Sequence, residues 1–217
     1  MSPEEFQKTI ADNAETINAI KDSAHNLHAN VNQHYDGALP YGFHLDMVAD
    51  SIYKYGDEVC ADADDVLPLF FGAYYHDSIE DARLTYNDVM RLARNVLTEE
   101  QALMATEVVY ALTNDKGRTR AERAGEKYYK GIRETPYAPF VKLCDRLANV
   151  AYSCSEDDGG NNRMKGVYKD EMGHFLQAIN PHSSDQRFLV PVEMIEALAE
   201  ILINDLEREE MLNQWGA

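Results

Sequence analysis

Apolar residues recur at helical spacing along most of the chain, and no stretch shows the period of two that is typical of a strand. At the N-terminus, Ser2, Pro3 and Glu5 predict an N-cap, a first helical position and a capping box. The apolar positions that follow on one face of this helix are Phe6, Ile10, Ile17, Ile20, Ala24 and Leu27. We expect the helix to end before the turn-rich segment HYDGALPYG.

Two further helices are expected in the next forty or so residues. One runs from about His44 to Tyr55 and stops at Gly56. The other begins after the acidic segment DADD and continues through FFGAYYHD, which requires Pro68 to lie in its first turn. The helix through FFGAYYHD would carry its ionisable residues within about one and a half turns.

Cap residues predict where later helices start. Thr85 is expected to cap one helix, and Thr98 forms a capping box with Gln101 at the start of the next. Further helices are expected at 118–131, at 137–154, at 163–178 and at 191–213, with a break at DDGGNN, 157–162. In the helix at 137–154 the inward positions are Val141, Leu143, Leu147 and Val150. The sequence therefore predicts an all-α fold, with residues 1–217 in a single domain.

Composition narrows the classes of function. The 217 residues carry a formal net charge of −18, which argues against nucleic acid and against an anionic membrane surface as partners. No apolar run is long enough to span a membrane and no signal peptide is recognisable, so we expect a cytoplasmic protein. Three cysteines without CxxC spacing predict reduced, packed thiols.

The segment YYHDSIED places four ionisable residues directly after an apolar run. On a helix, His76, Asp77, Glu80 and Asp81 would lie within about one and a half turns. Closely spaced carboxylates repel one another, and a divalent cation would compensate for this. Imidazole nitrogen and carboxylate oxygen are ordinary ligands for a transition metal. The alternative is a solvated helix end.

Two other segments favour the metal site. His44 follows LPYGF, at the start of the second expected helix. Asp145 lies within the apolar helix FVKLCDRLANV, where a carboxylate needs a compensating partner, and Asn149 follows at i+4 on the same face.

Four motifs occur in the order LPYGFH, HDSIED, LTNDK and KLCDRLAN. In this order the chain resembles the HD-domain metal-dependent phosphohydrolases over roughly residues 10–180. It is most similar to the hydrolase domain of RelA/SpoT-type enzymes and to the stand-alone small alarmone hydrolases related to metazoan SpoT homologues. The resemblance implies a helical HD-domain bundle and the hydrolysis of (p)ppGpp to release its 3′-pyrophosphate.

The resemblance also implies roles for individual residues. One divalent metal ion, usually manganese in this family, would be bound by His44, His76, Asp77 and Asp145. Glu80 and Asp81 match the acidic pair that positions or deprotonates water in family members that hydrolyse. The implied substrate-binding residues are Lys116, Arg118, Asn149 and Tyr168. The partner implied is a small phosphorylated nucleotide.

The basic segment 113–133 offers local positive charge, with seven basic residues against three acidic ones. Lys116 and Arg118 come first in it and are the phosphate-binding candidates, and a solvated helix face with i, i+4 ion pairs is the alternative. Family members carry an Arg–Lys pair before the first histidine, where this chain has Gln33 and His34. Specificity for guanosine therefore does not follow from the motifs.

Two other functions stay open at this point. One is a phosphatase of the same chemistry that acts on another phosphate ester, such as a deoxynucleotide or NADPH. The other is a non-catalytic nucleotide-binding regulatory module that retains the metal ligands. Intact Glu80 and Asp81 favour an enzyme over such a module. The oligomeric state does not follow from the sequence.

Overall fold

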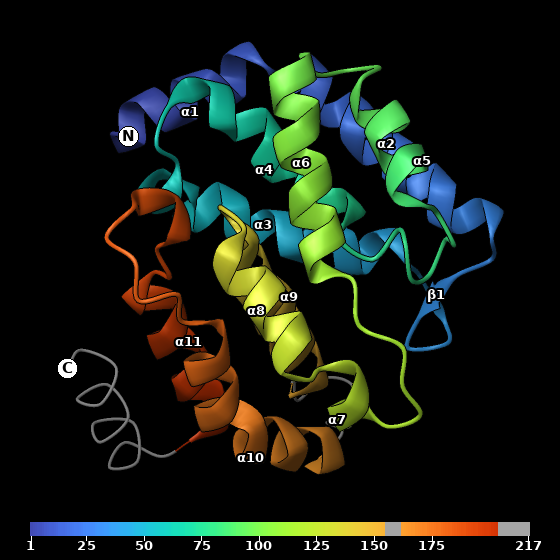
Figure 1. The fold of residues 1–217 in the computed structure, drawn as a ribbon, viewed down its shortest axis with the longest axis vertical. Coiled ribbons are helices and arrows are strands. Elements are labelled where there is room, and N and C mark those ends of the chain that lie inside the picture. The colour runs from blue at the N-terminus through green and yellow to red at the C-terminus, as the bar shows by residue number, and fades with distance from the viewer. Residues whose placement is uncertain (155–161, 204–217) are drawn as a thin grey trace.

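The computed structural model describes residues 1–154 and 162–203, which form an all-α bundle (Figure 1). The helices are α1 Pro3–Asp12, α2 Ala14–Asn30, α3 Gly42–Val59, α4 Val66–Tyr75, α5 Tyr86–Ala93, α6 Glu99–Leu112, α7 Arg120–Arg123, α8 Glu126–Glu134, α9 Ala138–Ser153, α10 Asn162–Ile179 and α11 Val192–Leu202. Single 3-10 turns occur at Ala63–Asp65 and Gln186–Phe188. The predicted all-α fold is thus confirmed.

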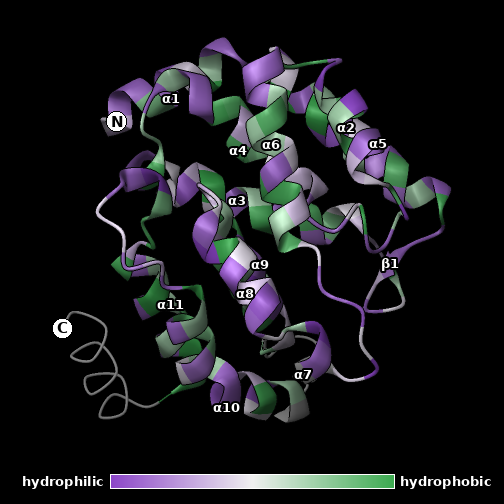
Figure 2. Ribbon diagram, viewed as in Figure 1, coloured by the Kyte–Doolittle hydropathy of each residue, from purple (hydrophilic) through white to green (hydrophobic). Residues whose placement is uncertain are grey.

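The core is built around α3, α4 and α9. Helix α3 packs against both α4 and α9, and α9 also contacts α8, α10 and α11. Every residue of α4 is buried, and in Figure 2 this helix is largely hydrophobic, whereas α8 is largely hydrophilic. Because α4 is covered on all sides, the chain segment that leaves its C-terminal end is held in a fixed position.

Three predicted helix starts are confirmed by their side-chain hydrogen bonds. Ser2, Thr85 and Thr98 each accept a hydrogen bond from the backbone three residues later, in complete capping boxes. Pro68 lies at the third residue of α4, where its missing N–H costs no helical hydrogen bond.

Some predicted helix boundaries were wrong. The first helix is divided at Asn13, whose side-chain amide donates to the carbonyl of Thr9 at 2.8 Å and so competes with the helical pattern. Gly56 does not end α3, which continues to Val59. A Cβ at Gly56 would overlap the buried ring of Phe6, so this glycine permits close packing of α1 on α3.

The polar helix predicted at 118–131 is two helices, α7 and α8, separated by Gly125 in an extended conformation. A short antiparallel hairpin, which the pattern did not indicate, joins β1 His34–Tyr35 to β2 Leu39–Pro40. Asp36 and Gly37 turn this hairpin with positive φ angles of 50° and 74°.

Parts of three predictions lie outside the described residues. These are most of the break at 157–162, the last residues of the helix at 191–213 and the C-terminal end of the domain 1–217. Within the described residues α11 ends at Leu202. In the same ranges no helix is both long enough and apolar enough to cross a membrane. The assignment of residues 1–217 to a single domain stays a prediction.

Candidate metal centre and adjoining cavity

Two histidines and an aspartate from three different helices meet inside the bundle. His44 lies in the first turn of α3, His76 directly follows α4, and Asp145 lies in the middle of α9. The two Nε2 atoms are 3.3 Å apart, and Oδ1 of Asp145 lies 3.3 Å from Nε2 of His44 and 3.7 Å from Nε2 of His76. Both imidazoles are at most 2% exposed. These three side chains can hold a metal ion.

Asp77 approaches the same point from the chain segment after α4. Its Oδ2 lies 2.9 Å from Nε2 of His76 and 3.7 Å from Nε2 of His44. The hydroxyl of Tyr41, a buried residue just before α3, donates to this oxygen at 2.5 Å. A second carboxylate therefore faces both imidazoles, and Tyr41 orients it.

The donor set fits a cation. Nδ1 of His76 lies 2.8 Å from the carbonyl of Ala73, which can only accept a hydrogen bond, so the lone pair of the neutral ring faces the cluster at Nε2. Burial opposes protonation of His76, but Asp77 and Asp145 outweigh it and raise its pKa well above the ordinary value. A positive charge between these carboxylates is thus favoured, and a divalent metal ion can supply that charge.

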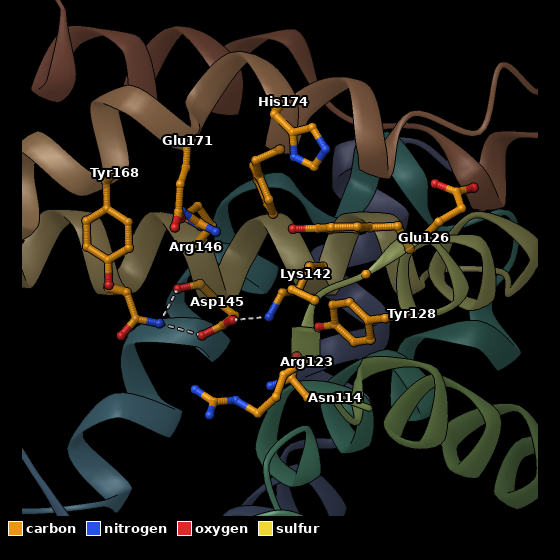
Figure 3. A pocket seen from close by; sticks show the side chains of 15 residues that line it. Asn114, Arg123, Glu126, Tyr128, Lys142, Asp145, Arg146, Tyr168, Glu171 and His174 are labelled. Atoms are coloured by element: carbon orange, nitrogen blue, oxygen red, sulfur yellow. Dashed lines mark hydrogen bonds and ion pairs between the residues drawn. The ribbon is translucent and has the colours of Figure 1, made fainter. Parts of the chain in front are cut away.

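Asp145 has polar partners at both carboxylate oxygens. Lys142 donates from Nζ to Oδ2 at 2.8 Å (Figure 3). Asn149 donates from Nδ2 to Oδ1 at 2.6 Å and to the backbone carbonyl at 3.0 Å. Burial alone would raise the pKa of Asp145, yet the positive charge of Lys142 and the adjacent imidazoles of His44 and His76 hold it well below the ordinary value. Asp145 is therefore an ionised, rigidly held carboxylate.

A cavity of about 720 Å³ opens beside the cluster, and Asp145 belongs to both (Figure 3). Helix α10 forms one wall, and α8 with the segment before it forms another. The cavity is lined by Asn114, Arg123, Ala124, Gly125, Glu126, Tyr128, Tyr129, Lys142, Asp145, Arg146, Asn149, Tyr168, Glu171, His174 and Phe175. Its size suits a small organic ligand, and its walls combine aromatic rings with three basic side chains.

Arg146 fixes the wall that α10 contributes. Its guanidinium donates to Glu171 at 2.9 Å and lies 5.0 Å and 4.3 Å from the ring centroids of Tyr168 and Phe175. Arg146 is 8% exposed and Tyr168 is 7% exposed. Tyr168, singled out from the sequence as a substrate-binding residue, therefore does line the cavity, held there by cation–π contact.

Glu80 and Asp81 do not lie on a helix as expected. Helix α4 ends at Tyr75, and residues 76–81 form consecutive turns, so the predicted i, i+4 pairs on a helix face are absent. The exposed carboxylate of Glu80 instead accepts two hydrogen bonds from Asn114, at 2.6 Å from the backbone and 3.0 Å from the side chain. Burial and the neighbouring charge of Asp77 raise the pKa of Asp81.

Two of the substrate-binding candidates lie away from the cavity. Lys116 and Arg118 are exposed, and neither belongs to the residues that line it. The basic residues that do line it are Arg123, from the same basic segment, and Lys142 and Arg146, from α9. Asn149 lines the cavity too, but its amide is bonded to Asp145 and also accepts a hydrogen bond from Tyr35 at 2.9 Å.

Sequence reasoning missed several residues around the centre. Lys142 and Arg146 flank Asp145 in KLCDRLAN at i−3 and i+1, and an apolar helix that carries three charges together is a signal that could have found them. Tyr41 is part of LPYGFH and was not assigned a role. No pattern along the chain singles out Tyr35, whose hydroxyl partner Asn149 is 114 residues away.

A scan against models of protein families and a search of curated proteins find no match to this chain. The geometry of the cluster and the cavity therefore carries the functional assignment.

Proposed function

We propose that the protein is a metal-dependent phosphohydrolase that acts on a small phosphorylated nucleotide, with the 3′-pyrophosphate of (p)ppGpp as the first candidate substrate. The observation that carries this proposal is the convergence of His44, His76 and Asp145 beside a cavity with basic side chains in its walls. The resemblance of the sequence motifs to the HD phosphohydrolases supports the same chemistry.

In this proposal, His44, His76 and Asp145 hold one divalent metal ion, and Asp77 completes the set. A mixed nitrogen and oxygen donor set suits a first-row transition ion, and the HD resemblance favours Mn²⁺. Such an ion lowers the pKa of bound water and offsets negative charge on phosphate oxygens. The surrounding carboxylates are already held in place by Lys142, Asn149 and Tyr41.

In our proposal, Glu80 and Asp81 position the attacking water or accept its proton. Burial and the charge of Asp77 raise the pKa of Asp81, and an upward shift is the direction that makes a carboxylate a better general base. Glu80 has its two oxygens fixed by Asn114, an uncharged partner that leaves its negative charge available. Proton transfer from a positioned side chain typically contributes 10²–10⁴-fold to a rate.

Phosphate groups would be bound by the basic residues of the cavity wall. Lys142 and Arg146 line the cavity and are already paired with Asp145 and Glu171, which offset much of their charge. Arg123 is exposed at the cavity rim and can move onto a ligand. The same walls carry Glu126, Asp145 and Glu171, so in this proposal the metal ion and Arg123 offset the charge of the phosphates.

The experiment is a substrate panel with purified protein. We expect Mn²⁺-loaded protein to release pyrophosphate from ppGpp. Chelation of the metal should abolish this release, and added Mn²⁺ should restore it. Glu80→Gln should reduce kcat by about 10²-fold or more, and Asn114→Ala by about tenfold because Glu80 loses both donors. Glu107→Gln, an exposed carboxylate on α6 that accepts from Tyr86, is the matched control.

One observation favours a second substrate within the same chemistry. The position of the family's basic pair is occupied by Gln33 and His34, and His34 is exposed, with Nδ1 3.0 Å from the carbonyl of Asn32. The panel therefore includes deoxynucleotides and NADPH. Release from these alone would replace the alarmone assignment, whereas binding of nucleotides without release from any of them would indicate a regulatory module.

A further inference from the structure

The two histidines of the cluster are oriented by different means. His76 is held through Nδ1 by the carbonyl of Ala73. Nδ1 of His44 is buried and has no hydrogen-bond partner among the residues that the structure describes. A metal-binding histidine usually donates its second ring nitrogen to an acceptor that fixes the ring. Another contact must therefore fix the orientation of the His44 imidazole.

That contact is a stack with Tyr35, from the first strand of the hairpin. The two rings are nearly parallel, with an interplanar angle of 8° and a centroid distance of 4.9 Å. Tyr41 meets the same imidazole edge-on, at 5.6 Å and 68°. A ring covered on its face by one aromatic side chain and at its edge by another cannot turn about its side-chain torsion without displacing them.

The hydroxyl of Tyr35 reaches a second residue of the cluster through one intermediate. It donates to Oδ1 of Asn149 at 2.9 Å, and Nδ2 of Asn149 donates to Oδ1 of Asp145 at 2.6 Å. Because Oδ1 of Asn149 takes the phenol proton, the amide nitrogen must face the carboxylate. The reversed amide would set two acceptors against each other.

We propose that Tyr35 is a positioning residue for the metal centre, which orients His44 through its ring and Asp145 through Asn149. This inference rests on the proposed metal site. It assigns a role to the hairpin 34–40, which has no metal-binding residue of its own, and it makes Asn149 an orienting residue for Asp145. The hairpin is thereby coupled to two of the three residues that can hold the ion.

The test measures metal binding directly, with Co²⁺ as the probe. Tyr35→Phe keeps the stack and removes the hydroxyl, and we expect Co²⁺ affinity to fall about tenfold, in the range seen when an orienting partner is removed. Tyr35→Leu also removes the ring and should weaken binding further and change the visible Co²⁺ spectrum. Far-ultraviolet circular dichroism of each variant verifies that the helices remain folded.

Tyr152→Phe is the matched control. The Tyr152 hydroxyl also links the hairpin to α9, by donating to Asp36 at 3.2 Å, and its ring meets Tyr35 edge-on at 4.9 Å. Tyr152→Phe removes this hydrogen bond and keeps the ring against Tyr35, so a variant that merely loosens the hairpin should leave Co²⁺ affinity unchanged.

The pathway through Asn149 is tested by a double-mutant cycle. In an Asn149→Ala background, Tyr35→Phe should cause no additional loss of Co²⁺ affinity, because the hydroxyl then has no route to Asp145. Equal Co²⁺ affinities of wild type and Tyr35→Phe would overturn the positioning role while leaving the proposed function intact. Failure of the wild type to bind Co²⁺ or Mn²⁺ would overturn both.

Discussion

Lys142 is a largely buried ammonium group, and its replacement by methionine tests what holds Asp145 in place. The pair has 17% and 13% side-chain exposure, and Nζ lies 2.8 Å from Oδ2. Attraction to Asp145 outweighs burial and raises the pKa of Lys142, so the pair is fully charged at neutral pH. Lys142→Met keeps a similar shape and leaves the carboxylate without its cation.

The magnitude follows from burial. At 2.8 Å and an effective dielectric constant of about 20, the gross attraction is roughly 6 kcal/mol. Removing the buried ammonium also recovers its desolvation cost, and breaking buried pairs typically costs about 3–5 kcal/mol net. Asp145 retains the hydrogen bond from Asn149, so we expect the low end, about 3 kcal/mol. This is a large share of the roughly 5–15 kcal/mol that stabilises a typical domain.

The assay is urea unfolding of metal-free protein at pH 7.5, followed by circular dichroism. Lys127→Met is the matched control, because Lys127 forms the same kind of pair with Asp115 at 2.9 Å but is 87% exposed. We expect no measurable change in its unfolding midpoint. If Lys142→Met and Lys127→Met unfold at the same urea concentration as wild type, the buried pair does not stabilise the fold and the reasoning fails.

Two further predictions concern other parts of the bundle. Burial and the neighbouring charge of Glu193 raise the pKa of Glu58 to about 7, so the folded state loses stability as pH rises through 7. After allowance for solvent screening, Glu58→Gln should be about 1–2 kcal/mol more stable than wild type at pH 8. In thermal melts near pH 4.5, most of this gain should be gone. Gly56→Ala should destabilise the protein by about 1–2 kcal/mol, because a Cβ would overlap the ring of Phe6 and this strain exceeds the gain in helix propensity. Gly131→Ala in α8, where a Cβ meets nothing within 4 Å, should be neutral or slightly stabilising, and equal urea midpoints for the two alanine variants would contradict the packing argument.

Local signals predicted the helical class and several helix starts. The capping boxes at Ser2, Thr85 and Thr98 depend on residues three positions apart, so sequence alone contains them. Boundaries were less predictable where side chains compete with the helix or where distant residues pack. Asn13 ends α1 with its side-chain amide bonded to the carbonyl of Thr9, and the glycine at 56 lies inside α3 because its missing Cβ leaves room for the ring of Phe6.

For the site, the sequence by itself determined the residue types that can hold a metal ion and the order in which they occur. His44, His76, Asp77 and Asp145 were predicted together because the resemblance to the HD phosphohydrolases implies them as ligands, and a carboxylate at Asp145 in an apolar helix favoured the same site. Lys142 and Asn149 contact Asp145 within α9, at helical spacings that the sequence contains. Only the tertiary structure decided the role of Tyr35, because it acts through packing of the hairpin on α3 and α9, and packing between separate elements leaves no periodic signal in the sequence.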